Sequence, residues 1–250
     1  MEEQFSFFKR AQFENIGVVS EEVMAERLLG EHQALCVVNT KKRAQHLYQR
    51  LKGDGVFHLS TTMYPNHRRR VLKLIRSRLK QGETCILIST SLVEAGVDLD
   101  FETVYRQIAG VDSMIQAAGR CNREGKRPLQ DSRVYIFDFE GAENVPSQRQ
   151  QMDAAKSLLK DGADLSDPES ITCYFKMLYH YKEDQMDKKE VLSEFKNKDY
   201  HFAKVGNEFR LIEEGNKTVF INREEEAGQI LQQLRFQGYT KGTLRKAQQY

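Results

Sequence analysis

The stretch Thr84-Cys-Ile-Leu-Ile-Ser-Thr-Ser-Leu-Val-Glu-Ala-Gly-Val-Asp98 decides the fold of this chain. Its first part, Thr84–Ile88, is an apolar, β-branched run without polar alternation, which favours a strand buried on both faces of a parallel sheet. Its second part, Ser89–Asp98, starts at the carboxyl end of that strand, where ligands gather in open α/β sheets. The stretch predicts an α/β domain with a binding edge, and the alternative is a bare strand and turn.

The same rhythm of short apolar runs and amphipathic segments continues on both sides of this stretch. Strands that alternate with helices predict an α/β layered domain with right-handed crossovers. The other predicted strands are Ala34–Val38, Gly55–Leu59, Thr103–Ile108 and Arg133–Phe137. The predicted helices are a segment that Thr40 caps and that reaches Leu51 before Gly53, the segment 66–81, and a segment that Asp112 or Ser113 caps and that runs through Gln116.

The pattern changes on both sides of this region, which divides the chain into an N-terminal helical segment over 1–30, a main domain over 31–140 and a smaller α+β appendage over 141–250. The appendage has predicted helices at 147–160, 168–183, 187–197 and 224–235, with a β-hairpin of Phe209–Glu213 and Thr218–Asn222. The N-terminal segment has a predicted helix, Ser20–Leu29. Its aromatic residues, Phe5–Phe8 and Phe13, are expected to cover an edge, and the alternative is contact with a missing part such as another lobe.

The composition excludes several classes of protein. A chain of 250 residues that is 40% hydrophobic and 30% charged is neither disordered, collagen-like nor a short disulfide scaffold. No apolar run approaches the ~20 residues of a membrane span, and the acidic start lacks the basic region of a secretory signal. The four cysteines stand singly and the six histidines are scattered, so we expect no metal site of the protein's own. We expect a cytoplasmic protein without a membrane partner.

The formal net charge of +2 hides a local excess of positive charge. Residues 41–80 contain twelve Lys or Arg side chains and one acid, Asp54. Such an excess is typical of a surface that follows a phosphate backbone. Solvated helix faces that happen to be basic are the alternative.

The segment Gln116-Ala-Ala-Gly-Arg-Cys-Asn-Arg123 places two arginines three residues apart, after a helix and a glycine. A guanidinium keeps its charge and presents planar donors that match phosphate oxygens. At the edge of a domain, such arginines stabilise the charge on a transferring γ-phosphoryl group, an effect of about 10³–10⁵ in rate. An ordinary helix C-terminus, where basic residues satisfy the last carbonyls, is the alternative.

The turn after the first strand carries groups suited to a nucleotide. The hydroxyls of Ser89, Thr90 and Ser91 can donate to phosphate. Gly96 permits close backbone approach, and Asp98 is an acceptor suited to a ribose hydroxyl.

In this order and at this distance, the two segments resemble the fifth and sixth motifs of superfamily 2 helicases. Thr90 precedes Gly96-Val-Asp98 by six residues, and Gln116-x-x-Gly-Arg-x-x-Arg123 follows. Two segments are more specifically similar to the helicase-nuclease of type I CRISPR interference: Glu94-Ala-Gly-Val-Asp-Leu-Asp-Phe101 and Ala118-Gly-Arg-Cys-Asn-Arg-Glu-Gly125. That enzyme degrades invading DNA that a guide-RNA complex has recruited. The resemblance covers about 30–140 strongly and the rest more loosely.

The upstream sequence agrees with this resemblance. Val38-Asn-Thr-Lys-Lys42 is similar to the fourth motif, and His58-Leu-Ser60 with Arg68 is similar to the nucleic-acid-contacting stretch beside it. The resemblance implies a RecA-like parallel sheet layered with helices, followed by linker helices and an accessory region. It implies that Arg120 and Arg123 reach the γ-phosphate while Gln116 positions them or the attacking water. The implied nucleotide-binding residues are Gly96, Asp98 and Glu94, and the implied nucleic-acid-binding residues are Asn39, Thr40, His58, Ser60, Arg68 and Thr90.

The sequence departs from the family pattern in two ways. Ala117 stands where many relatives have Arg, which removes one possible phosphate contact. No Gly-x-x-x-x-Gly-Lys-Ser/Thr loop, Asp-Glu-x-His box or His-Asp nuclease cluster occurs in the sequence. We therefore expect ATP with magnesium as cofactors, both held mainly by a separate P-loop lobe, and no ATPase activity without that lobe. The implied partners are single-stranded DNA, the P-loop lobe, a nuclease domain and the guide-RNA complex.

Three functions remain open at this point. The first is the C-terminal motor lobe of a CRISPR-associated single-stranded DNA helicase or translocase. The second is the equivalent lobe of another superfamily 2 DNA or RNA helicase. The third is a non-catalytic nucleic-acid-binding domain that has kept the fold, because a fold alone does not determine a function.

Overall fold

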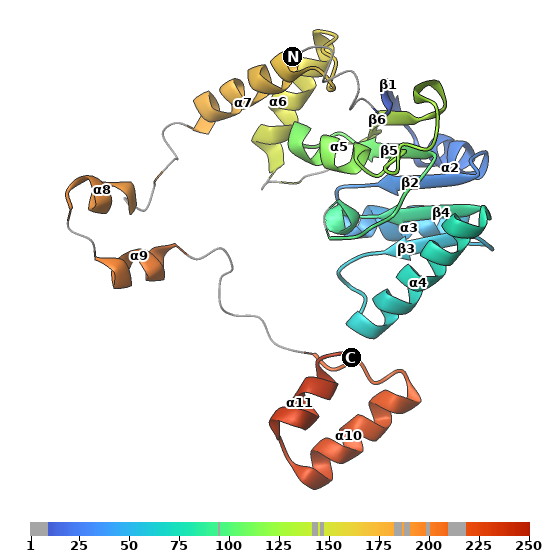
Figure 1. Cartoon of the computed structure of the whole chain (residues 1–250), viewed down its shortest axis with the longest axis vertical. Coiled ribbons are helices and arrows are strands. Elements are labelled where there is room, and N and C mark those ends of the chain that lie inside the picture. The colour runs from blue at the N-terminus through green and yellow to red at the C-terminus, as the bar shows by residue number, and fades with distance from the viewer. Residues whose placement is uncertain are drawn as a thin grey trace.

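A single parallel sheet forms the centre of the computed structural model, which describes residues 10–94, 96–141, 145, 148–182, 187, 191–198, 201–209 and 219–250. The six strands run in the order β1-β6-β5-β2-β4-β3, and every neighbouring pair is parallel (Figure 1). The strands are β1 (Gln12–Val19), β2 (Gln33–Val37), β3 (Val56–Leu59), β4 (Cys85–Ser89), β5 (Thr103–Gln107) and β6 (Arg133–Phe139). The RecA-like α/β class expected from the sequence is confirmed.

The central strands are buried because helices cover both faces of the sheet. Every residue of β2, β4 and β5 is buried. The mostly apolar sequences of β2 and β4 predict this, whereas β5 also buries Thr103, Arg106 and Gln107. On one face, α2 (Glu21–Leu29) and α3 (Lys41–Leu51) pack with residues such as Met24 and Leu47. On the other face lie α4 (Pro65–Gln81), α5 (Val111–Ala118), α6 (Arg149–Lys160) and α7 (Pro168–Lys182).

The predicted N-cap residue is confirmed for α3 but not for α5. The Thr40 hydroxyl accepts a hydrogen bond from the backbone N–H of Arg43 at 3.2 Å, so it caps α3 as predicted. The prediction that Asp112 or Ser113 caps α5 is wrong, because the helix begins at Val111 after Gly110. The Ser113 hydroxyl instead donates to the carboxylate of Glu94 at 3.0 Å.

The N-terminal segment is not purely helical. The predicted helix is present as α2, with Ser20 as its N-cap, but Gln12–Val19 forms the edge strand β1 beside β6. Only Val19 of this strand is buried and its register shifts between Asn15 and Gly17, so the alternation of its apolar and polar residues is irregular. Phe13 packs against the core, whereas residues 5–8 lie outside the described part of the chain.

After β6, every regular element in the described part of the chain is a helix. Besides α6 and α7, the helices are α8 (Val191–Lys196), α9 (Phe202–Glu208), α10 (Glu225–Gln237) and α11 (Lys241–Ala247). The sequence predicted α6, α7, α8 and α10 but not α9 or α11. Most of the predicted hairpin, 210–218, lies outside the described residues. The chain end contacts the start of α4, where the rings of Tyr64 and Tyr250 stack with centroids 5.9 Å apart.

Among the helices described here, none combines the length and apolar character that crossing a membrane requires.

Candidate functional site: a loop between the strand edge and two arginines

The carboxyl ends of three neighbouring strands gather several predicted nucleic-acid-binding residues. Asn39 and Thr40 follow β2, Ser60 follows β3 and Thr90 follows β4. Because β2, β4 and β3 are adjacent and parallel, these residues lie along one edge of the sheet. This edge is the position at which open α/β sheets bind ligands.

At β2, the polar groups of this edge are held by the protein itself. The Asn39 side-chain amide donates to the carbonyl of Ile108 at 2.8 Å, and its oxygen accepts from Arg106 at 2.8 Å. Thr40 starts α3, whose next two residues, Lys41 and Lys42, are exposed. The positive end of the helix dipole and two lysines together favour a phosphate at this corner.

The neighbouring candidates are less accessible. Ser60 is fully buried and its hydroxyl lies 2.6 Å from that of Thr62. Thr90 is also buried, and Arg68 is half-buried near the start of α4. His58 stacks on Tyr48 with ring centroids 5.6 Å apart, and burial, followed by the nearby His67, lowers its pKa.

The loop after β4 leaves this edge and crosses toward the opposite end of the sheet. A short 3₁₀ turn, Ser91–Val93, comes first, and the chain then passes Gly96 and Asp98 to the start of β5. Phe101, just before β5, forms a bridge with Cys121, so the segment after α5 reaches the amino end of the strand. One loop therefore connects Thr90 at the strand edge with Asp98 beside the two arginines.

Arg123 and Asp98 form an exposed ion pair at the far end of this loop. The Arg123 Nε lies 2.7 Å from the Asp98 carboxylate, with 44% of the Arg123 side chain and 81% of the Asp98 side chain exposed. The Arg123 backbone N–H donates to Asp100 at 2.7 Å, which fixes where the side chain begins. Gly96 has a φ of +73° with open space around it. Gln116 is exposed on α5.

Arg120 differs from Arg123 in that it is buried and bonded inside the protein. It is only 6% exposed. Its Nε donates to the carbonyl of Val93 at 2.9 Å and its Nη2 to the carbonyl of Glu94 at 2.6 Å. Burial is the largest cause of its lowered pKa, and the positive charge of Arg123 adds to the effect. In this structure, Arg120 holds the loop while Arg123 faces solvent.

Glu94, predicted to bind the nucleotide, turns its carboxylate into the protein. Its Oε1 lies 3.0 Å from the Nε of Arg106, and the side chains of the two residues are 5% and 2% exposed. Burial raises the pKa of Glu94 and lowers that of Arg106, while each charge opposes the shift of the other. Sequence reasoning missed Arg106, although an arginine inside a buried strand is a signal, since buried charges require partners.

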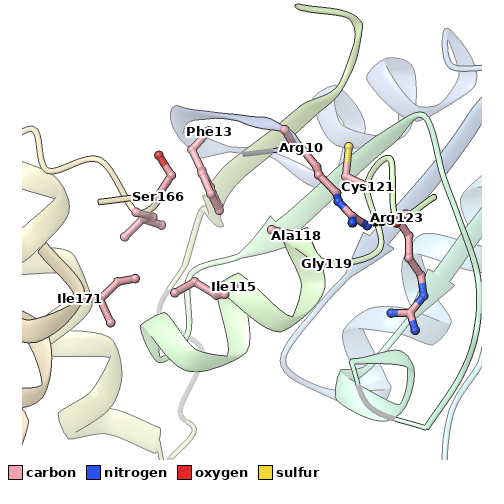
Figure 2. A pocket seen from close by; sticks show the side chains of 11 residues that line it. Arg10, Phe13, Ile115, Ala118, Gly119, Cys121, Arg123, Ser166 and Ile171 are labelled. Atoms are coloured by element: carbon pink, nitrogen blue, oxygen red, sulfur yellow. Dashed lines mark hydrogen bonds between the residues drawn. The ribbon is translucent and has the colours of Figure 1, made fainter. Parts of the chain in front are cut away.

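An open pocket of about 550 Å³ lies beside Arg123 (Figure 2). Phe13 from β1, Ile115 from α5 and Ile171 from α7 supply its apolar walls, while Arg10 and Arg123 lie together on the other side. The guanidinium of Arg10 donates to the backbone carbonyl of Arg123. A ligand in this pocket would meet apolar carbon on one side and guanidinium groups on the other.

The ranges that the structure describes contain no group of three or more His, Cys, Asp or Glu side chains arranged to hold a metal ion.

Comparisons with known proteins point to one family. Residues 30–126 match the family model described as the C-terminal region of the CRISPR-associated nuclease/helicase Cas3. The CRISPR-associated helicase Cas3 of Thermoproteus tenax is 27% identical over 178 residues, which are 66% of this chain and 31% of that protein. The CRISPR-associated nuclease/helicase Cas3 of Haloferax volcanii is 54% identical over 70 residues, which are 28% of this chain and 8% of that protein.

Solved structures agree with the fold. The structure of T. fusca Cas3 with AMPPNP has a TM-score of 0.56 at 19% identity, and the match covers 79% of this chain and 26% of that one. A chain of a CRISPR RNA-guided surveillance complex before nicking has a TM-score of 0.53 at 19% identity, with 80% and 28% covered. At this identity the likeness concerns the fold. The chain spans less than a third of the length of the curated relatives named above.

Proposed function

We propose that this chain, whose residues 30–126 match the C-terminal family model of the CRISPR-associated nuclease/helicase Cas3, is the second motor lobe of an ATP-dependent single-stranded DNA helicase or translocase. In this proposal, the lobe acts in CRISPR interference against foreign DNA. It supplies an arginine for ATP hydrolysis and contacts for the DNA backbone. It is inactive as an ATPase without a lobe that carries a P-loop.

One observation carries the proposal: the loop Thr90–Asp98 connects the edge where Asn39 and Thr40 lie with the exposed pair of Asp98 and Arg123. A translocase needs such a connection, because hydrolysis at one site must move contacts at another. The positive charge at Lys41 and Lys42 suits a DNA backbone, with contacts that are independent of sequence and sensitive to salt.

The residues present fit one side of an ATP site. Arg123 is exposed and its Nε is paired with the exposed carboxylate of Asp98, so its guanidinium can exchange Asp98 for a γ-phosphate. ATP, when bound, supplies the phosphoryl group whose transfer releases free energy for movement. In this chain, Arg123 stabilises negative charge, Arg120 holds the loop at Val93 and Glu94, and Gln116 orients the water or the arginine. A P-loop lobe would hold magnesium and the remaining phosphates.

The partners follow from the same proposal. They are single-stranded DNA, the P-loop lobe with its nuclease domain and a guide-RNA interference complex, all in the cytoplasm. The presence of a similar chain in a CRISPR RNA-guided surveillance complex supports the last partner.

ATP turnover tests the proposal. The chain is assayed at low salt alone and with a P-loop lobe, each with and without single-stranded DNA. We expect no turnover by the chain alone and DNA-stimulated turnover with the second lobe. Arg123→Ala should lower that turnover by about 10³-fold. Arg133→Ala is the matched control, because Arg133 is 46% exposed and paired with a surface carboxylate, and it should change nothing.

Two results would overturn the proposal. One is DNA-stimulated turnover by the chain alone that survives repurification. The other is full turnover by Arg123→Ala in the two-lobe assay. Stimulation by single-stranded RNA in preference to DNA would instead identify the lobe of an RNA helicase.

A further inference from the structure

Arg106 is a charged residue in the most buried part of the sheet. It lies in β5, where every residue is buried, and its own side chain is 2% exposed. Removing a guanidinium from water is costly, and apolar residues of similar volume often stabilise such a position equally well or better. A contribution to stability therefore does not by itself account for an arginine here.

The contacts of Arg106 reach two segments of the candidate site. Its Nη1 donates to the Asn39 side-chain oxygen at 2.8 Å and to the backbone carbonyl of Gln107 at 2.6 Å. On the other side, its Nε lies 3.0 Å from the Glu94 carboxylate. Arg106 thus joins the residue after β2 to the middle of the loop after β4.

Glu94 extends the connection to α5 and to the arginine segment. Its second carboxylate oxygen accepts from the Ser113 hydroxyl at 3.0 Å. Its backbone carbonyl accepts from the Arg120 guanidinium at 2.6 Å. We call Asn39, Glu94, Arg106, Ser113 and Arg120 the Glu94 network.

The Glu94 network spans the distance that coupling would have to cross. Asn39 is at the strand edge with the proposed DNA contacts, whereas Arg120 is three residues before Arg123 at the other end of the loop. Because Glu94, Arg106 and Arg120 are buried and Asn39 and Ser113 are half-buried, a shift of the loop moves Asn39 unless it breaks the Arg106–Glu94 ion pair or the hydrogen bond from Arg106 to Asn39.

We propose that Arg106 is a positioning residue that couples ATP hydrolysis to the DNA contacts, by joining Asn39 to Glu94 in the loop that Arg120 holds. Arg106 touches neither DNA nor nucleotide. This inference rests on the proposed function as a motor lobe, and it adds the route by which the two sites communicate.

The test separates positioning from stability. In the two-lobe assay, Arg106→Met should keep the KM for ATP within about twofold and the basal turnover unchanged, but lose about tenfold of the stimulation by single-stranded DNA. Since Arg106→Met leaves Glu94 buried without its charge partner, it should also lower stability. The double variant Arg106→Met with Glu94→Leu removes both charges and should recover stability in urea unfolding, yet still lack the stimulation.

Each outcome decides the inference. Recovery of both stability and DNA stimulation in the double variant would reduce the pair to a structural role and overturn the inference. If the double variant does not fold, Ser113→Ala removes one hydroxyl from the Glu94 network. It should lower the stimulation about threefold, with a smaller fall of the urea midpoint than Arg106→Met gives, and full stimulation would again overturn the inference. If the wild-type protein itself shows no DNA stimulation, the proposed function fails, and this result is obtained without any variant.

Discussion

Arg120 and Arg123 should respond in opposite ways to the same substitution, although they lie three residues apart. Replacing Arg120 by Met should destabilise the fold, whereas replacing Arg123 by Met should leave the fold unchanged and abolish ATP turnover in the two-lobe assay. The reason is that Arg120 is 6% exposed with donors bonded to two backbone carbonyls, whereas Arg123 is 44% exposed and forms one surface ion pair.

The magnitude follows from these contacts. A hydrogen bond that involves a charged group contributes about 1.5–3 kcal/mol, so two such bonds contribute roughly 3–6 kcal/mol. Met keeps most of the apolar stem of Arg120 and removes the desolvation of its charge, which returns part of that loss. We expect Arg120→Met to lower the free energy of unfolding by about 2–4 kcal/mol. Arg123→Met should change it by less than about 0.5 kcal/mol, as is usual for exposed pairs.

Urea unfolding followed by circular dichroism measures both values. The midpoint should fall for Arg120→Met at an unchanged slope, and stay in place for Arg123→Met. In thermal unfolding, each kcal/mol corresponds to about 2–4 °C for a domain of this size. Equal stability of the two variants, or a larger loss for Arg123→Met, would refute the reasoning that the buried arginine holds the loop and the exposed one is free to act.

Three further predictions concern the strand edge and the loop. The double variant Lys41→Ala with Lys42→Ala should weaken single-stranded DNA binding and reduce the slope of log affinity against log salt by up to about 1.4, which fluorescence anisotropy across a salt series measures. Burial, followed by the charge of His67, lowers the pKa of His58 below 6.5, so the folded state favours the neutral ring. The stabilisation from the neutral ring should be complete above about pH 6.5 and should fall as the pH drops. His58→Gln should flatten that fall in urea midpoints taken from about pH 7 to 5. Gly96→Ala should destabilise by roughly 1–2 kcal/mol through backbone strain alone, since φ is +73° and the space is open, while Gly96→Asn should cost less in the same unfolding assay.

The central strands β2 and β4 were predictable because their sequences are mostly apolar without polar alternation, which is typical of strands buried on both faces, whereas β5 also buries Arg106. The hydroxyl that caps α3 was equally visible in the sequence, because Thr40 directly precedes the helix. The cap of α5 was not, since Ser113 is a good capping residue whose hydroxyl is taken by Glu94, and that pairing exists only in three dimensions.

The candidate site was partly visible in the sequence. The spacing of Thr90, Gly96 and Asp98 identified the loop, and the structure brings Asp98 together with Arg123. The sequence did not distinguish a buried arginine from an exposed one, because Arg120 and Arg123 have the same side chain and similar neighbours. It also did not reveal Arg106 as the partner of Glu94, because eleven residues lie between them and the chain crosses the sheet before they meet.

The position of β1 at one edge of the sheet determines which limits a recombinant fragment of this protein should have. The family match, 30–126, contains the motif segments but neither β1 nor β6. A recombinant fragment with those limits would keep only β5-β2-β4-β3, and β5, buried at every position in the intact sheet, would become an open edge. Such an edge of unpaired backbone and apolar side chains invites aggregation. Expression trials should therefore retain the chain from Gln12 through Phe139, because the segment that the family model matches is smaller than the unit that folds.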